Sequence, residues 1–289
     1  MTIARILLAF SICMAAVASA PAVAQTPAPA PSAVPTAGAT PAPPSDPCGS
    51  IMSIVNRPTI GTGVCTVRTG HFDVETGYTN TDTTGPGGSV TGNYPQGLIR
   101  LGTSDSHLDV EVGTPSFNTS NAAGIVTSGW SDLSVGAKYE IGYTSQWVYG
   151  VNGVFTVPTG KPAFSAGNAQ FTGNFNWGYS INSEFGLAGT LGLNALSAYN
   201  AGGQPQSYFA FIPSIMATAA LPGGPSELFG EYAYFSQAGP NLGSKSYFDF
   251  GYVRDFGPHL QFDVEYGFSP TTINLQKQHY IGAGISFMN

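Results

Sequence analysis

The chain has 289 residues, of which 42% are hydrophobic and 12% aromatic but only 9% charged. Soluble domains carry roughly 25% charged residues, so this composition disfavours a soluble globule and suits a β-barrel with a lipid-facing outer surface. The net charge of −7 argues against a nucleic-acid partner, which requires a basic surface. Beyond the N-terminus the sequence has no run of about 18 apolar residues, the length that predicts a transmembrane helix.

Residues 1–24 have the pattern of a secretory signal peptide. Arg5 supplies a positive charge, residues 6–18 form an apolar stretch, and Ala22-Val23-Ala24 is a small-residue cleavage site. Cys13 lies inside the apolar stretch, where the preceding Ser11-Ile12 does not match a lipoprotein signal. We therefore expect export without a lipid anchor.

Two short regions follow the signal. Residues 25–47 consist almost wholly of Ala, Pro, Thr and Ser, which cannot bury a core, so we expect a disordered Pro/Ala-rich linker. Its favoured role is spacing, and binding of a periplasmic partner is the alternative. Residues 48–66 contain Cys48 and Cys65, which an oxidising compartment favours as a disulfide. We expect this small cystine-closed segment at the barrel entrance. No metal is expected, because two Cys without a nearby His cannot complete a zinc shell, and no cofactor is expected.

Residues 67–289 contain segments in which apolar and polar residues alternate, the period of a half-buried strand. We count twelve: 67–78, 96–103, 107–113, 132–141, 146–157, 169–179, 184–194, 207–219, 227–235, 247–254, 260–268 and 279–289. An even count is typical of bacterial single-chain barrels, and most segments approach the roughly 9–11 residues that cross a bilayer at a tilt. The expected fold is all-β: a twelve-stranded antiparallel transmembrane β-barrel at 67–289, preceded by the disordered segment.

The connections alternate in length. They are long after the odd segments, as at 80–94, 114–131, 158–168 and 195–206, and short after the even ones. Long outer loops and short periplasmic turns are the pattern of outer-membrane barrels, so we predict the bacterial outer membrane, with lipid around the barrel and both termini periplasmic. A soluble β-sandwich is the rival fold, but it would carry more surface charge. Aromatic residues expected on the apolar face near strand ends, as interface girdles, are Tyr78, Trp147, Trp177, Tyr179, Tyr266 and Tyr280.

Several strings resemble the bacterial outer-membrane transporter family of phenol-degradation meta-pathway proteins. Leu98-Ile99-Arg100-Leu101-Gly102 and Leu108-Asp109-Val110-Glu111-Val112 are similar to its early strands, the first of which contains an arginine. Gly129-Trp130-Ser131-Asp132-Leu133 with Gly136-Ala137-Lys138-Tyr139 resembles its G-x-x-D-L-x-x-G-x-K-Y stretch, and Val157-Pro158-Thr159-Gly160 resembles its Pro-Thr-Gly loop entry. The resemblance covers residues 67–289, with its motifs between 96 and 160. It implies a barrel that admits small, often aromatic or hydrophobic, molecules, and it brings no catalytic residues.

The alternation assigns charged side chains to the lumen. They are Asp73, Glu75, Arg100, Asp109, Glu111, Lys138, Glu140, Glu184, Glu231, Asp263 and Glu265. One interpretation is a polar pathway with a cation preference, because rings of carboxylates favour cations. The other is a plugged barrel in which Arg100 and Lys138 join the carboxylates in a hydrogen-bonded core. A pore and a plug would use the same residues, so both interpretations stay open.

An enzyme is the other class of function to weigh, because outer-membrane phospholipases are also twelve-stranded. The candidate bases are His71, expected in the lumen, His107 and His259 at short turns, and His279. No Gly-x-Ser-x-Gly elbow accompanies them, so catalysis is not expected. The predicted function is passive passage of small solutes through the barrel. The alternative is a non-transporting barrel used for envelope structure or surface attachment, and ion conductance separates the two.

Overall fold

The computed structural model describes residues 45–289 apart from 201 and 274. The predicted signal peptide and all but the last residues of the predicted linker lie outside this part of the chain. The described elements are one short helix, α2 (Ile51–Ile54), and fifteen strands. No helix in the described ranges is long and apolar enough to span a membrane.

The strands have the following bounds: β1 (Phe72–Thr84), β2 (Ser89–Tyr94), β3 (Gly97–Gly102), β4 (Leu108–Thr114), β5 (Phe117–Ala122), β6 (Ile125–Trp130), β7 (Leu133–Tyr143), β8 (Trp147–Val157), β9 (Gln170–Ser180), β10 (Phe185–Tyr199), β11 (Pro205–Ala220), β12 (Ser226–Phe235), β13 (Lys245–Asp255), β14 (Leu260–Phe268) and β15 (Lys277–Met288).

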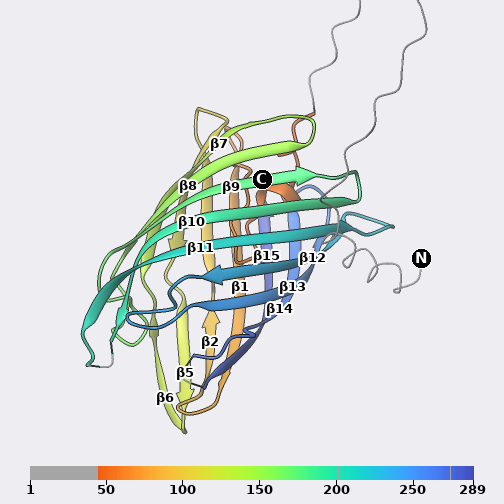
Figure 1. Ribbon diagram of the computed structural model, residues 1–289. Coiled ribbons are helices and arrows are strands. Elements are labelled where there is room, and N and C mark those ends of the chain that lie inside the picture. The colour runs from red at the N-terminus through yellow and green to blue at the C-terminus, as the bar shows by residue number, and fades with distance from the viewer. Residues whose placement is uncertain (1–44, 201, 274) are drawn as a thin grey trace, which may run out of the picture. The chain divides into compact units, whose positions relative to one another are not determined.

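Twelve of these strands close into an antiparallel barrel (Figure 1). The neighbours run β1, β3, β4 and then β7 to β15 in chain order, and β15 pairs back with β1 from Asp73 opposite Met288 to Thr84 opposite Lys277. Closure leaves no free sheet edge around the ring, which a spanning barrel requires. The predicted all-β fold with a twelve-stranded antiparallel barrel is confirmed, and each of the twelve predicted segments contains most of one barrel strand.

The strands correct the prediction of three long loops. The loop at 195–206 is reduced to residues 200–204, because β10 runs to Tyr199 and β11 starts at Pro205. The loops at 80–94 and 114–131 hold the remaining three strands. β1 continues to Thr84, and β2, β5 and β6 extend its sheet beyond the barrel ring in the order β1, β2, β5, β6, at the lower end of Figure 1. Sequences such as Thr79-Asn80-Thr81-Asp82-Thr83-Thr84 have no apolar face. They form strands because backbone hydrogen bonds to neighbours hold them, so hydrophobic periodicity gave no signal.

Side chains of the ring alternate between an apolar outer face and a polar lumen. In β15, Ile281, Ile285 and Phe287 are about half exposed, while Ser286 is buried. This is the reverse of a soluble protein, since the largest fully buried side chains are Arg100 and Lys138. Tyr280 corrects the predicted girdle: its ring lies over Gly267 on the lumen side, because it shares the parity of Ser286 and not of Ile281. The polar core of the molecule is therefore inside the barrel.

Candidate functional site: the lumen and the segment inside it

A charged cluster lines one wall of the lumen, on the adjacent strands β1, β3, β4 and β7. The Arg100 guanidinium lies 2.6 Å from Asp109 Oδ2, 3.8 Å from Asp73 Oδ2 and 3.9 Å from Glu75 Oε1. All four side chains are at most 1% exposed. Register explains their meeting, because Asp73 pairs with Arg100 across β1 and β3, and alternate residues share a face. Buried carboxylates need such partners, because an isolated buried charge is costly.

Residues 48–66, here the lumen segment, are held by lumen carboxylates. Glu75 accepts hydrogen bonds from the backbone N–H groups of Asn56 and Arg57 at 2.9 and 3.0 Å. On the opposite wall, Glu231 accepts from Ile60 and Gly61 at 2.7 and 2.8 Å. Charge-assisted bonds of this kind are about twice as strong as neutral ones. The segment therefore bridges β1 and β12 across the lumen.

Basic side chains complete the attachment. Arg100 donates to the carbonyls of Ile54 and Cys65, at 2.5 and 2.7 Å, and Lys138 Nζ donates to Asn56 Oδ1 at 2.7 Å. From the segment itself, Arg57 forms an ion pair with Asp263 at 3.3 Å. The basic side chains of Arg100 and Lys138, which the sequence assigned to the lumen, therefore bind the segment as well as carboxylates.

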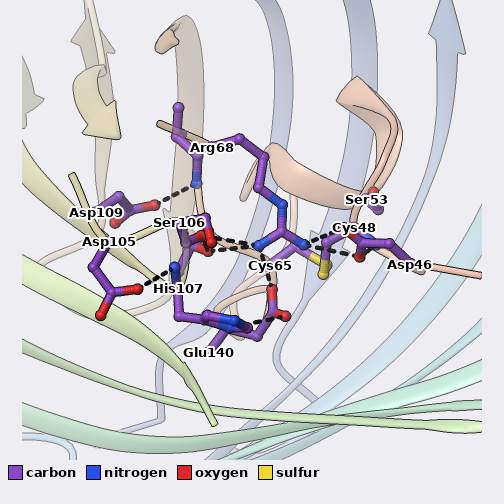
Figure 2. Close-up of polar contacts among 12 residues, drawn as sticks. Asp46, Cys48, Ser53, Cys65, Arg68, Asp105, Ser106, His107, Asp109 and Glu140 are labelled. Carbon is purple, nitrogen blue, oxygen red and sulfur yellow. Dashed lines mark hydrogen bonds and ion pairs between the residues drawn. A yellow bond between two sulfur atoms is a disulfide. The ribbon is translucent and has the colours of Figure 1, made fainter. Parts of the chain in front are cut away.

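The predicted Cys48–Cys65 disulfide is present and closes the base of the segment (Figure 2). Beside it, Arg68 pairs with Asp46 at 2.7 Å and with Glu140 at 3.1 Å. The sulfurs pack with Ile54 and Val67 in a small apolar cluster. Val67 N–H donates to Asp109 Oδ2 at 2.8 Å and so ties the exit of the segment to the wall.

This placement goes beyond the expected position at the barrel entrance. The cystine lies at the end of the barrel that carries the short turns, next to the start of β1, whereas Ile60 and Gly61 reach Glu231 near the middle of β12. The reason is electrostatic: the acidic lumen offers more carboxylates than its own Arg100 and Lys138 can pair, and the segment supplies backbone N–H groups and Arg57.

Two cavities flank residues 56–59 of the segment. A cavity of about 380 Å³ lies between the segment and strands β8 to β14, with Met52, Val55, Met216, Phe229 and Val253 among its lining residues. A second, of about 330 Å³, lies beside Glu75, Gln96 and Glu265. Both are lined by Asn56, Arg57, Pro58 and Thr59. The lumen is therefore divided by the segment but not filled by it.

The structure brings most of the residues assigned to the lumen into this interior. Asp73, Glu75, Arg100, Asp109, Glu111, Lys138, Glu140, Glu231 and Asp263 are buried there, and Glu265 is half-buried. Glu184 is not among them: it is exposed in the turn before β10, because the strand begins one residue later than expected. His71 is likewise exposed, with Nδ1 2.6 Å from the Asn289 carbonyl, and does not face the lumen.

Sequence reasoning missed three lumen participants. Asp249 lies on the inner face of β13 between the outward Phe248 and Phe250, so its period-two position was a usable signal. Arg57 belongs to the lumen segment, where no periodicity assigns a direction to its side chain. Arg68 lies in the part of the predicted strand 67–78 that precedes the start of β1, so the alternation does not apply to it. Their roles depend on contacts with residues far away in sequence.

A closed antiparallel barrel with an apolar outer face and a polar, charged lumen has the features of the membrane-spanning β-barrel fold class. The chain belongs to the family described as "Putative MetA-pathway of phenol degradation", whose model matches residues 55–287. The resemblance seen in the sequence is confirmed, and the match begins inside the lumen segment.

Solved structures show the same fold. The chain is similar to the COG4313 outer membrane channel from Pseudomonas putida F1, at 11% identity over 78% of this chain and 97% of that one, with a TM-score of 0.56. It is also similar to the NanC porin, at 10% identity over 73% of this chain and 98% of that one, with a TM-score of 0.51. Among curated proteins none matches the chain.

Proposed function

We propose that the protein is an outer-membrane channel through which small molecules pass passively, and that the lumen segment restricts their route. The observation that carries the proposal is the division of a closed barrel lumen into two cavities by residues 56–59. Family membership and the fold shared with an outer membrane channel support the same function. The proposal assigns no catalytic role to any residue.

The cavity walls support a small, largely uncharged and hydrophobic solute, aromatic molecules included. Met52 and Val55 of the segment face a cavity whose barrel wall includes Met216, Phe229 and Val253. Such inward apolar residues are unusual in a polar lumen. The charged lumen residues then act by holding the segment in place, which sets the width of the route, and through it the selectivity.

In this proposal the short-turn end, where the cystine lies, faces the periplasm. The long connections and the extension of β2, β5 and β6 then lie outside the cell. An epitope inserted at residues 202–203 between β10 and β11 should be detected on intact cells. The same epitope at residues 222–224 between β11 and β12 should be detected only after the outer membrane is opened. The reverse result would invert the orientation.

The central test is single-channel conductance in planar bilayers. The mature protein and a form lacking residues 25–66 are compared, and heat-dependent gel migration confirms that both barrels are folded. We expect small or infrequent steps from the mature protein and larger ones from the shortened form. A folded shortened barrel that never conducts would contradict the channel and favour the structural or surface-attachment role.

A further inference from the structure

Three carboxylates form an acidic group on the wall opposite Arg100 and Lys138. Glu231 and Asp249 are direct cross-strand partners on β12 and β13, and Glu265 on β14 pairs with Gly251, two residues along from Asp249. All three project into the lumen, because they share the parity of their strands' inward positions. We call Glu231, Asp249 and Glu265 the acidic wall.

Among the described residues Asp249 has neither a hydrogen bond nor an ion pair, whereas Asp73 and Glu140, which also lack hydrogen bonds, lie within ion-pair distance of Arg100 and Arg68. The side chain of Asp249 is 0% exposed, and neither of its oxygens has a hydrogen-bond partner in the part of the chain that the structure describes. By contrast, Glu75 and Glu231 accept backbone bonds from the lumen segment, and Asp263 pairs with Arg57. The polar groups beside Asp249 are the carboxyl of Glu265 and the hydroxyl of Tyr280. A buried carboxylate in such a position lacks the compensation that burial normally demands.

In the described part of the chain, no basic side chain forms an ion pair with Asp249. Arg57 is bound to Asp263 and Gln96, and Lys245 is hydrogen bonded to Gln278. Arg100 and Lys138 belong to the β3 and β7 side and are bound there. The acidic wall therefore has an excess of negative charge that the protein's own cations do not neutralise.

The acidic wall reaches both cavities. Glu231 lines the larger cavity and Glu265 lines the smaller one. Asp249 lines neither cavity but neighbours both residues, so it lies between the parts of the wall that reach the two cavities.

We propose that the acidic wall binds a small monovalent inorganic cation, such as sodium or potassium, and carries such cations past the lumen segment. A divalent ion is disfavoured, because it needs several ligand atoms close together. Among the described residues, the one group of three ligand atoms within 4.8 Å of one another is Asp46, Cys48 and Glu140, which does not belong to the acidic wall. That group is unsuited to a metal, since its Cys48 is in the disulfide. The carboxylates of the acidic wall lie on three neighbouring strands, an arrangement that suits weak, successive binding of the kind that conduction needs.

The first test measures binding without requiring conduction. Sodium NMR relaxation is recorded in sodium chloride with the purified full mature chain, with Asp249→Asn, and with Glu184→Gln as a control. The control removes the same charge from an exposed turn position outside the lumen. We expect the line broadening caused by the wild type to persist in Glu184→Gln and to be lost in Asp249→Asn. Equal broadening by all three proteins would overturn the proposal.

The second test measures ion selectivity in the same proteins. Reversal potentials in a potassium chloride gradient should show a cation preference that falls about twofold or more in Asp249→Asn, because carboxylates in a pore favour cations. An unchanged preference in conducting, folded Asp249→Asn would show that Asp249 is neutral, for example through a proton shared with Glu265, and would refute the site. A wild type that binds sodium but never conducts would refute the channel and leave the binding site standing.

Discussion

Replacing Glu75 by Gln should release the lumen segment. In the native protein both Glu75 oxygens accept backbone bonds, from Asn56 at 2.9 Å and Arg57 at 3.0 Å. A glutamine keeps one acceptor oxygen and presents an NH₂ donor to the other N–H group. The change removes one charge-assisted bond, worth about 1.5–3 kcal/mol, and leaves a buried donor unpaired. A net cost of about 2–3 kcal/mol lowers the ratio of docked to undocked segment roughly 30- to 150-fold.

Single-channel recording measures this shift as a longer open time or a larger mean conductance of Glu75→Gln. Glu111→Gln is the matched control. Glu111 is also buried in the cluster around Arg100 and Lys138, but it makes no hydrogen bond to the lumen segment among the described contacts. If both variants change conductance equally, lumen charge and not attachment of the segment controls the route, and the reasoning fails. If neither variant differs from the wild type, the segment does not restrict conduction.

Three further outcomes follow from the same structure. The disulfide joins residues 17 apart and should restrain the segment by about 3 kcal/mol. Dithiothreitol should therefore raise the conductance of the wild type but not that of a Cys48→Ser, Cys65→Ser double variant. Equal effects on both proteins would argue against a role of the disulfide in restraining the segment. Arg100→Met leaves buried carboxylates uncompensated, so the free energy of unfolding in lipid should fall by about 3–5 kcal/mol, measured from urea titrations; a neutral result would show that the cluster is protonated or hydrated. Phe250→Arg on the outer face of β13 should lower the free energy of unfolding by about 2–4 kcal/mol in the same assay if residue 250 contacts lipid. Leu242→Arg, in the β12–β13 connection, is the control and should lower it little.

The barrel could be predicted because its determinant is local. Alternation in β15 separates Ile281, Ile285 and Phe287 from Gly282, Gly284 and Ser286, and a period of two forces them to opposite faces wherever the strand lies. Tyr280 was placed on the wrong face because its aromatic character was weighed above its parity. The extension of β2, β5 and β6 was missed because its strands have little apolar alternation.

The position of residues 48–66 depends on tertiary structure alone. The Cys48–Cys65 pair followed from the sequence, since two cysteines in a chain with a predicted secretory signal favour a disulfide. The attachment of the segment involves Glu75 and Glu231, which lie 18 to 171 residues away from the groups they bind. No local pattern records which carboxylate will meet which N–H group, because barrel closure decides the pairing. The sequence by itself determined a barrel with an acidic lumen. Folding decided that Glu75, Glu231 and Asp263 hold the chain's own segment and that Asp249 is left without a partner.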